Sequence, residues 1–144
     1  MTATVAVAGA LLAVSLLSEE KGRPVAWRDL TMEVGPLTIA DRERRLFRER
    51  EELDRYLARA KARGPTPQID FSRRQLLLVS PGPRSSTGYE VEVLSVSERD
   101  GEITVRVREQ TPALQDRVEP RVTHPYRLLS LPAGATVAVD WVGR

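Results

Sequence analysis

The sequence contains no cysteine and only one histidine among its 144 residues. The absence of cysteine excludes disulfide bonds, thiolate metal sites and a cysteine nucleophile. A single histidine, His124, cannot build a metal site that needs several histidines. The phosphate-binding pattern GxxxxGK[ST] and the nucleophile pattern G-x-S-x-G are also missing. We therefore expect a protein without catalytic residues, without a bound metal and without a cofactor.

His124 lies in the stretch RVTHPYRL, directly before a proline, and no nucleophile is marked beside it. This setting favours a structural residue at a loop or strand end over a catalytic base. No pair of carboxylates is isolated in an apolar stretch, as a glycosidase acid would require. A hydrolase that uses His124 remains the enzymatic alternative.

The chain also has little net charge, with 22 basic and 20 acidic residues and a formal charge of +2. Nine of the basic residues fall between positions 41 and 63, together with six acids. Interspersed acids weaken a phosphate-binding surface, so a solvated face with mixed ion pairs is the favoured interpretation. We do not expect a nucleic-acid partner.

Charge is absent altogether from Thr2 to Leu17 (TATVAVAGALLAVSLL). This run is shorter than the roughly 20 residues that span a membrane, but it fits the apolar region of an export signal. Residues 1–18 are therefore predicted to be an export signal or N-terminal anchor, and the alternative is a buried strand or helix. The protein is expected in the periplasm, the cell envelope or the medium, with membrane association only through residues 2–17.

Residues 19–66 are predicted to form a hairpin and a helix. Gly35-Pro36 divides two apolar stretches between positions 25 and 39, which is typical of a short hairpin. Next comes an apolar stripe with a spacing of 3.6 residues per turn, formed by Leu46, Leu53, Tyr56, Leu57 and Ala60, with Phe47 at its edge. The stripe predicts an amphipathic helix from Asp41, as N-cap, to Arg63, ended by Gly64 and Pro65.

Residues 67–144 are predicted to form a β domain that packs as one unit with residues 19–66. Strands are expected over 75–79, 89–93, 103–107, 123–131 and 135–142, and a turn at Asp100-Gly101 joins the second to the third. This antiparallel pair should place Glu90 and Glu92 near Arg108 and Arg106 on its wet face. That register needs a longer loop or a β-bulge. The fold class is therefore β-rich α+β, with an antiparallel sandwich-like sheet and one amphipathic helix.

Three loops combine proline with hydroxyl or aromatic groups at strand ends, namely 81–89, 111–118 and 123–127. Loops at one end of a sandwich cluster in space and can present a binding surface. Ordinary turn chemistry is the alternative, because proline fixes φ and glycine permits positive φ. The residues that we select as candidate partner contacts are Arg84, Ser86, Thr87, Gly88, Tyr89, His124 and Tyr126. Tyr89 also begins the apolar face of its strand, so the alternative for this residue is a position in the core.

Several short motifs occur in an order that resembles the C-terminal domain family of PrcB. They are Asp70-Phe71-Ser72, then Arg84-x-x-Thr87-Gly88-Tyr89 and YEVEV, and finally Thr123-His124-Pro125-Tyr126-Arg127-Leu128-Leu129-x-Leu131-Pro132. The resemblance extends over about residues 69–142. It implies a non-enzymatic, exported protein that associates with or stabilises a protease.

Thr87-Gly88-Tyr89 is also similar to one loop of the chagasin-type inhibitors of cysteine proteases, which insert loops into a protease cleft. Their glycine-rich loop and their Arg-Pro-Trp loop have no recognisable counterpart here. The predicted function is therefore that of a protease-associated accessory subunit that binds through strand-end loops. The alternatives are a structural envelope module without a specific loop partner and a loop-inserting protease inhibitor.

Overall fold

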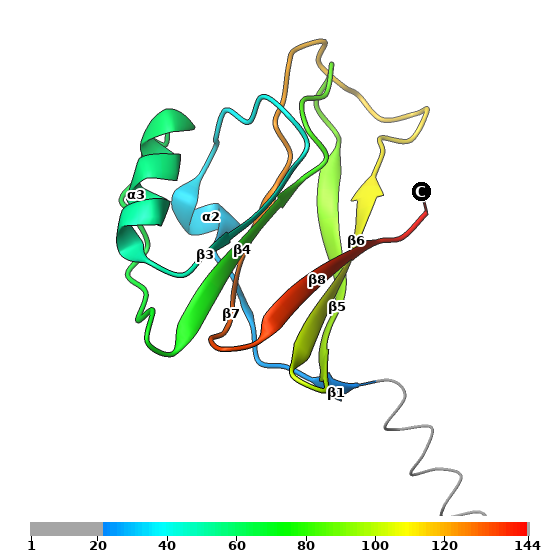
Figure 1. Ribbon diagram of the computed structural model, residues 1–144. Helices are drawn as coiled ribbons and strands as arrows, with labels where there is room; N and C mark the ends of the chain where they lie inside the picture. Colours follow the sequence, from blue (N-terminus) through cyan, green and yellow to red (C-terminus); the bar gives the residue numbers. More distant parts are fainter. Residues whose placement is uncertain (1–21, 144) are drawn as a thin grey trace, which may run out of the picture.

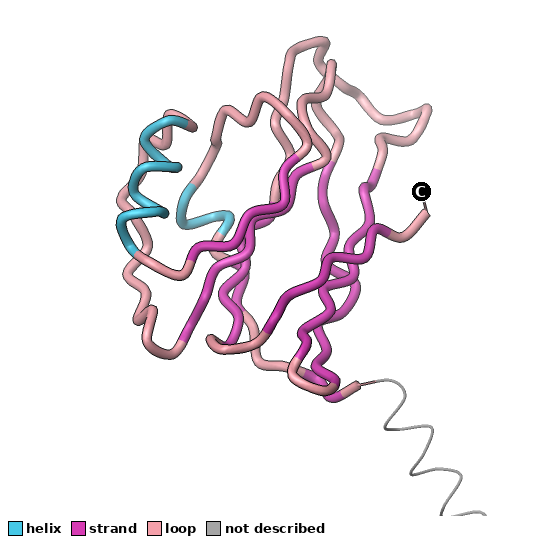
Figure 2. Tube along the Cα trace, viewed as in Figure 1, coloured by secondary structure: helices cyan, strands magenta, loops and turns pink. Residues whose placement is uncertain are grey.

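The computed structural model describes residues 22–143 as two four-stranded sheets with helices on one outer side (Figure 1). The elements in chain order are β1 (Arg23–Pro24), β2 (Arg28–Asp29), α2 (Thr31–Val34), β3 (Glu43–Phe47), α3 (Arg50–Arg59), β4 (Arg74–Ser80), β5 (Glu90–Arg99), β6 (Glu102–Gln110), β7 (Arg127–Pro132) and β8 (Thr136–Trp141). Sheet A has the strand order β1-β5-β6-β8, and sheet B has the order β2-β7-β4-β3. Figure 2 shows the two groups of strands and the helices beyond one of them. The predicted β-rich α+β class is confirmed.

Sheet B is buried on both faces, which explains the unbroken apolar run of β4. Alternate residues of a strand point to opposite faces. Leu76, Leu78 and Leu128 accordingly pack with the helices, whereas Leu77 and Leu129 pack against sheet A, and all five are fully buried. Sheet A buries one face only, so its strands alternate between apolar and polar residues.

The predicted helix from Asp41 to Arg63 is wrong in its first half. Residues 43–47 form β3, which pairs antiparallel with β4, and α3 begins only at Arg50, after the N-cap Glu49. Leu46 and Phe47 show why strand pairing prevails over the helical stripe. Phe47 is buried on the helix side of sheet B, whereas Leu46 is partly buried on the side of sheet A, so the two side chains pack on different faces. The second half of the stripe is confirmed, because Leu53, Tyr56, Leu57 and Ala60 are buried.

The predicted hairpin over residues 25–39 is also wrong. This segment crosses from sheet A to sheet B and contains β2 and the single helical turn α2, so the fold has a second, short helix. Thr31 fixes the turn, because its backbone N–H donates to Asp29 Oδ1 and its hydroxyl accepts from the Leu128 N–H. Side-chain anchoring to β7 thus replaces the cross-strand pairing that a hairpin would need.

The β5–β6 hairpin confirms the predicted turn and bulge. Asp100 and Gly101 both have positive φ, as a two-residue type I′ turn requires, and the register shifts between Val93 and Ser95. The prediction placed the charges on the correct face but two residues out of register. Glu92 lies opposite Arg108 and accepts from it at 2.6 Å, a bond that lowers the pKa of the Glu92 carboxyl.

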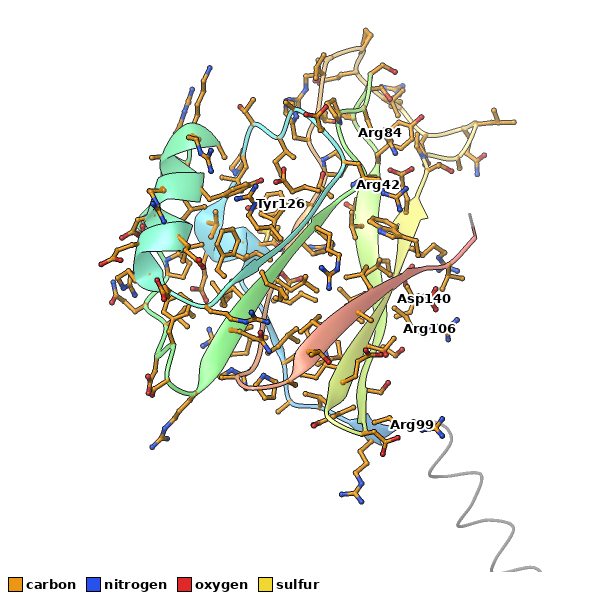
Figure 3. The ribbon with its side chains drawn as sticks, in the orientation of Figure 1. Arg42, Arg84, Arg99, Arg106, Tyr126 and Asp140 are labelled. Carbon is orange, nitrogen blue, oxygen red and sulfur yellow. The ribbon has the colours of Figure 1, made fainter. Side chains whose placement is uncertain are left out.

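Two further details differ from the predicted sheet. Arg106 pairs with Asp140 of β8, as Figure 3 shows, instead of with a glutamate of β5. The chain crosses from β7 in sheet B to β8 in sheet A, and β8 then runs parallel to β6. Sheet A is therefore mixed, although every other strand pair is antiparallel.

An arginine from sheet B bridges each open corner of the sandwich. At one corner, Arg127 Nε of β7 donates to the Val91 carbonyl of β5 at 2.6 Å. At the other corner, Arg44 of β3 donates to the Val137 carbonyl of β8. Val137 lies on the edge strand β8, and Val91 lies in the part of β5 that β1 does not pair, and unpaired backbone groups at such edges invite further strand pairing. The arginines therefore tie the two sheets together and cover one carbonyl on each edge.

The predicted export segment, residues 1–18, lies outside the described residues. Within residues 22–143, no helix is long and apolar enough to cross a membrane.

Candidate functional site

The loops that follow β4 and β6 meet at one end of the sandwich, as predicted for a two-sheet fold (Figure 1). Arg84 and Thr123 form an isolated antiparallel bridge, in which each backbone N–H donates to the other residue's carbonyl at 2.9 Å. The Thr123 hydroxyl donates to the Ser86 carbonyl at 2.8 Å. Ser86 directs its own hydroxyl to the Thr87 carbonyl. Hydrogen bonds therefore fix the shape of this loop end.

Arg84 holds the loop end to the sheet through its side chain. Its Nε and Nη2 atoms donate to the two carboxylate oxygens of Glu109, at 2.9 and 3.0 Å, in a bidentate pair. Nη1 donates to the Pro83 carbonyl at 3.0 Å, and the guanidinium lies 5.8 Å from the centre of the Tyr89 ring. The side chains of Arg84 and Glu109 are only 23% and 12% exposed. This predicted contact residue is therefore largely engaged within the fold.

Replacement of Arg84 by methionine is expected to lower the free energy of unfolding by about 1–3 kcal/mol, because the largely buried Glu109 carboxylate loses the two N–H donors of Arg84. Urea denaturation measures this change. The matched control is Arg106→Met, whose pair with Asp140 is about half exposed and should change stability by less than about 0.5 kcal/mol. Equal effects of the two substitutions would contradict the anchoring role of Arg84.

Thr87 and Gly88 connect this loop to the segment after β6. The Thr87 N–H donates to the Glu119 carbonyl at 3.1 Å, and its hydroxyl accepts from the Glu119 N–H at 2.9 Å. Gly88 has φ +96°, and a Cβ at this position would lie 2.9 Å from Pro112 Cβ and 3.1 Å from Val118 Cγ1. Only glycine fits this backbone conformation and this close approach. Gly88 therefore sets the path by which Tyr89 enters β5.

An open groove of about 490 Å³ lies beside the loop end, between the start of β5 and the segment around α2. Tyr89, His124 and Tyr126 line it, so three of the seven predicted contact residues share one surface. The other lining residues are Thr31, Met32, Gly35, Pro36, Glu90, Val91, Pro125 and Arg127. Arg84, Ser86, Thr87 and Gly88 belong to the loop end and not to the groove wall.

His124 and Tyr126 fasten the wall of this groove to the segment after α2. The Nδ1 atom of His124 lies 3.2 Å from the backbone N and 2.8 Å from the carbonyl O of Ile39. The Tyr126 hydroxyl donates to the Gly35 carbonyl, and the side chain is largely buried (Figure 3). Burial, with a smaller contribution from Asp29, raises the pKa of Tyr126 and keeps its hydroxyl a neutral donor. Tyr126 therefore contributes mainly structure, and its hydroxyl is already engaged.

Met32 and Pro36 are groove residues that the sequence analysis missed. Met32 is 89% exposed at the groove rim, an unusual position for a long apolar side chain. Both residues belong to the segment predicted to form a hairpin, in which apolar residues would face the core. An indication was present in the sequence, since Pro36 follows Gly35 and the Gly-Pro pair marks an irregular loop.

The described residues contain no group of three or more histidine, cysteine, aspartate or glutamate side chains that could hold a metal ion. The fold and the site define a sandwich-like β module with one fixed loop end and an adjacent open groove. Residues 76–132 match the family model described as PrcB C-terminal. Over this segment, the match confirms the resemblance to the PrcB C-terminal domain family that the sequence predicts. The matched segment runs from β4 to the end of β7 and includes all seven predicted contact residues.

Neither a curated protein nor a solved structure matches the chain.

Proposed function

We propose that this protein is a non-enzymatic, exported accessory subunit that associates with a protease and binds it through the groove beside the strand-end loops. The PrcB C-terminal match supports a role in a protease complex. The observation that carries the choice of surface is the exposed Met32 at the rim of a groove that also contains Tyr89 and Pro36. Exposed apolar side chains around a concave surface favour binding of another protein.

The loops have a supporting role in this proposal. Their hydroxyl and guanidinium groups bond to neighbouring backbone and to Glu109, which fixes the groove wall before a partner arrives. A preformed surface loses little conformational entropy on binding. The export segment and the absence of catalytic motifs, both inferred from the sequence, agree with an accessory subunit outside the cytoplasm.

The test is co-purification of the tagged full-length chain from envelope and medium of the source cells, with partners identified by mass spectrometry. We expect a protease among the partners, and we expect Met32→Glu to reduce its recovery by about tenfold or more, which corresponds to one apolar contact. Leu114→Glu is the matched control, because Leu114 is fully exposed but does not line the groove. Thermal unfolding must show that both variants remain folded.

Recovery of no protease would overturn the accessory-subunit proposal and leave a structural envelope module in its place. Loss of the protease with Leu114→Glu, but not with Met32→Glu, would move the contact from the groove to the 111–118 loop.

A further inference from the structure

The outer edge of β5 is paired along only part of its length. β1 pairs with Ser97 and Glu98, and the Val25 N–H donates to the Val96 carbonyl at 3.2 Å. Between Glu90 and Ser95, no strand in residues 22–143 lies on that side of β5. Sheet A therefore has an edge that accepts an antiparallel strand at one end and is open at the other.

The backbone groups of Val93 point out of this open edge. In an antiparallel pair, opposite residues turn their N–H and C=O groups either toward each other or away from each other. Val93 lies opposite Val107, whose carbonyl accepts from the Val142 N–H and so faces β8. Val93 therefore turns its N–H and C=O away from β6. Two residues earlier, the Val91 carbonyl also points outward, where Arg127 covers it.

The open edge runs directly into the groove, because Glu90 and Val91 belong to both and Tyr89, which directly precedes β5, also lines the groove. An extended peptide on this edge would form backbone hydrogen bonds with β5, and its alternate side chains would face the groove. This combination of a free sheet edge and an adjacent apolar depression is the arrangement that β-strand addition requires.

Glu90 adds a charge preference to this surface. Three other acidic side chains nearby each have an arginine partner, in the pairs Glu92–Arg108, Asp29–Arg127 and Glu33–Arg28. Glu90 is exposed and has no ion pair within the described part of the chain. Its side chain lies on the opposite face of β5 from the buried Val91. A complementary strand would carry an apolar side chain toward the groove and a basic side chain toward Glu90.

We propose that the groove binds an extended segment of a partner protein as an added strand on β5, in line with β1. This inference rests on the proposed function and specifies its contact. The outward N–H and C=O groups of Val93 form the backbone hydrogen bonds. An apolar side chain of the segment packs against Met32, Pro36 and Tyr89, and a neighbouring lysine or arginine pairs with Glu90.

The test is a titration of the ¹⁵N-labelled full-length chain with three blocked peptides, followed by NMR. The first is Ac-Thr-Leu-Lys-Leu-Thr-NH₂, the second has glutamate in place of lysine, and the third is the lysine peptide with N-methylated leucines. We expect the lysine peptide to shift the amide signals of Glu90 to Ser95 and to bind about fivefold more tightly than the glutamate peptide. The N-methylated peptide lacks the two leucine N–H donors, which lie on one edge of the extended peptide, and should produce no such shifts.

Two substitutions separate strand addition from simple apolar adsorption. Val93→Pro removes an outward N–H and leaves the β5–β6 hydrogen bonds in place, and proline is tolerated at such edge positions. Its matched control is Val139→Pro on the outer edge of β8. The N–H groups of Thr136 and Val142 donate to β6 and its preceding turn, so the residues at odd positions between them, including Val139, turn their N–H groups outward. We expect Val93→Pro to abolish binding of the lysine peptide and Val139→Pro to preserve it. Glu90→Arg should reverse the order of the lysine and glutamate peptides.

Strand addition is overturned if the peptide shifts lie outside β5 and the groove, if N-methylation has no effect, or if none of the peptides binds at millimolar concentration. Should Val93→Pro fail to fold, the Glu90→Arg reversal and the N-methylated peptide decide the question. Co-purification of a protease that is insensitive to Val93→Pro would refute strand addition and retain the proposed function. Peptide binding at β5 without a co-purified protease would retain strand addition and refute the protease partner.

Discussion

Replacement of Gln75 by glutamate is expected to lower the free energy of unfolding by about 3–5 kcal/mol at pH 7, because it places an uncompensated charge in the interior. Gln75 is 1% exposed, in the region where β4, β7 and β8 approach one another. Its Nε2 donates to the carbonyls of Pro132 and Ala135 at 2.9 and 3.0 Å. A carboxylate has no proton for either carbonyl, so two bonds are replaced by two repulsive contacts.

The loss should depend on pH in a defined direction. Burial raises the pKa of the introduced carboxyl in the folded state above its value in the unfolded chain, which is about 4.3. The folded variant then retains a proton that the unfolded chain releases, so its stability falls as the pH rises through this interval. Relative to the natural protein, the variant should therefore be less destabilised at pH 4 than at pH 7. At pH 4 the protonated carboxyl still supplies one O–H donor, which the carboxylate lacks.

Urea denaturation at both pH values measures this effect. Gln75→Met is the control, since it removes the two donors but introduces no charge, and it should cost about 1–3 kcal/mol at either pH. It also removes Oε1, which is buried and has no hydrogen-bond partner among the described residues. A Gln75→Glu variant that is as stable as Gln75→Met at pH 7 would contradict the assigned role of Nε2.

The predictable parts of the fold are those in which local chemistry and tertiary contacts agree. β5 and β6 alternate in period two around Asp100-Gly101, so the hairpin and its bulge follow from neighbouring residues. β3 shows the opposite case. Its Leu46 continues the helical stripe of Leu53 and Tyr56, yet the segment pairs with β4, which lies about 30 residues further along the chain. Nothing local distinguishes that strand from the first turns of a helix.

The same distinction applies to the candidate site. Proline and glycine mark the loop end in the sequence, and Tyr89 and His124 are predictable as site residues from it. The groove, however, consists of three segments that only the sheet topology brings together. Met32 has no sequence feature that separates a rim position from a core position, because its exposure depends on how α2 is anchored to β7 by Thr31.

Leu77→Ala and Leu78→Ala are each expected to lower the free energy of unfolding by about 2–5 kcal/mol, although these leucines are adjacent in one strand. Leu77 faces sheet A and Leu78 faces α3 and its surroundings, and both are fully buried. In a sheet with one wet face, adjacent positions cannot both carry such a cost, because one of the two side chains would be solvated. Two large and similar losses in the free energy of unfolding would therefore show that sheet B is covered on both faces.

Sheet A supplies the matched comparison within the same molecule. Val105 is fully buried on its inner face, and the next residue, Arg106, is about half exposed. Val105→Ala should cost on the order of 1–3 kcal/mol, and Arg106→Ala should lie within about 0.5 kcal/mol of the natural protein. If Leu78→Ala were as mild as Arg106→Ala, the helices would not form a second core on sheet B. The packing of α2 on sheet B, and with it the position of Met32 at the groove rim, depends on this second core.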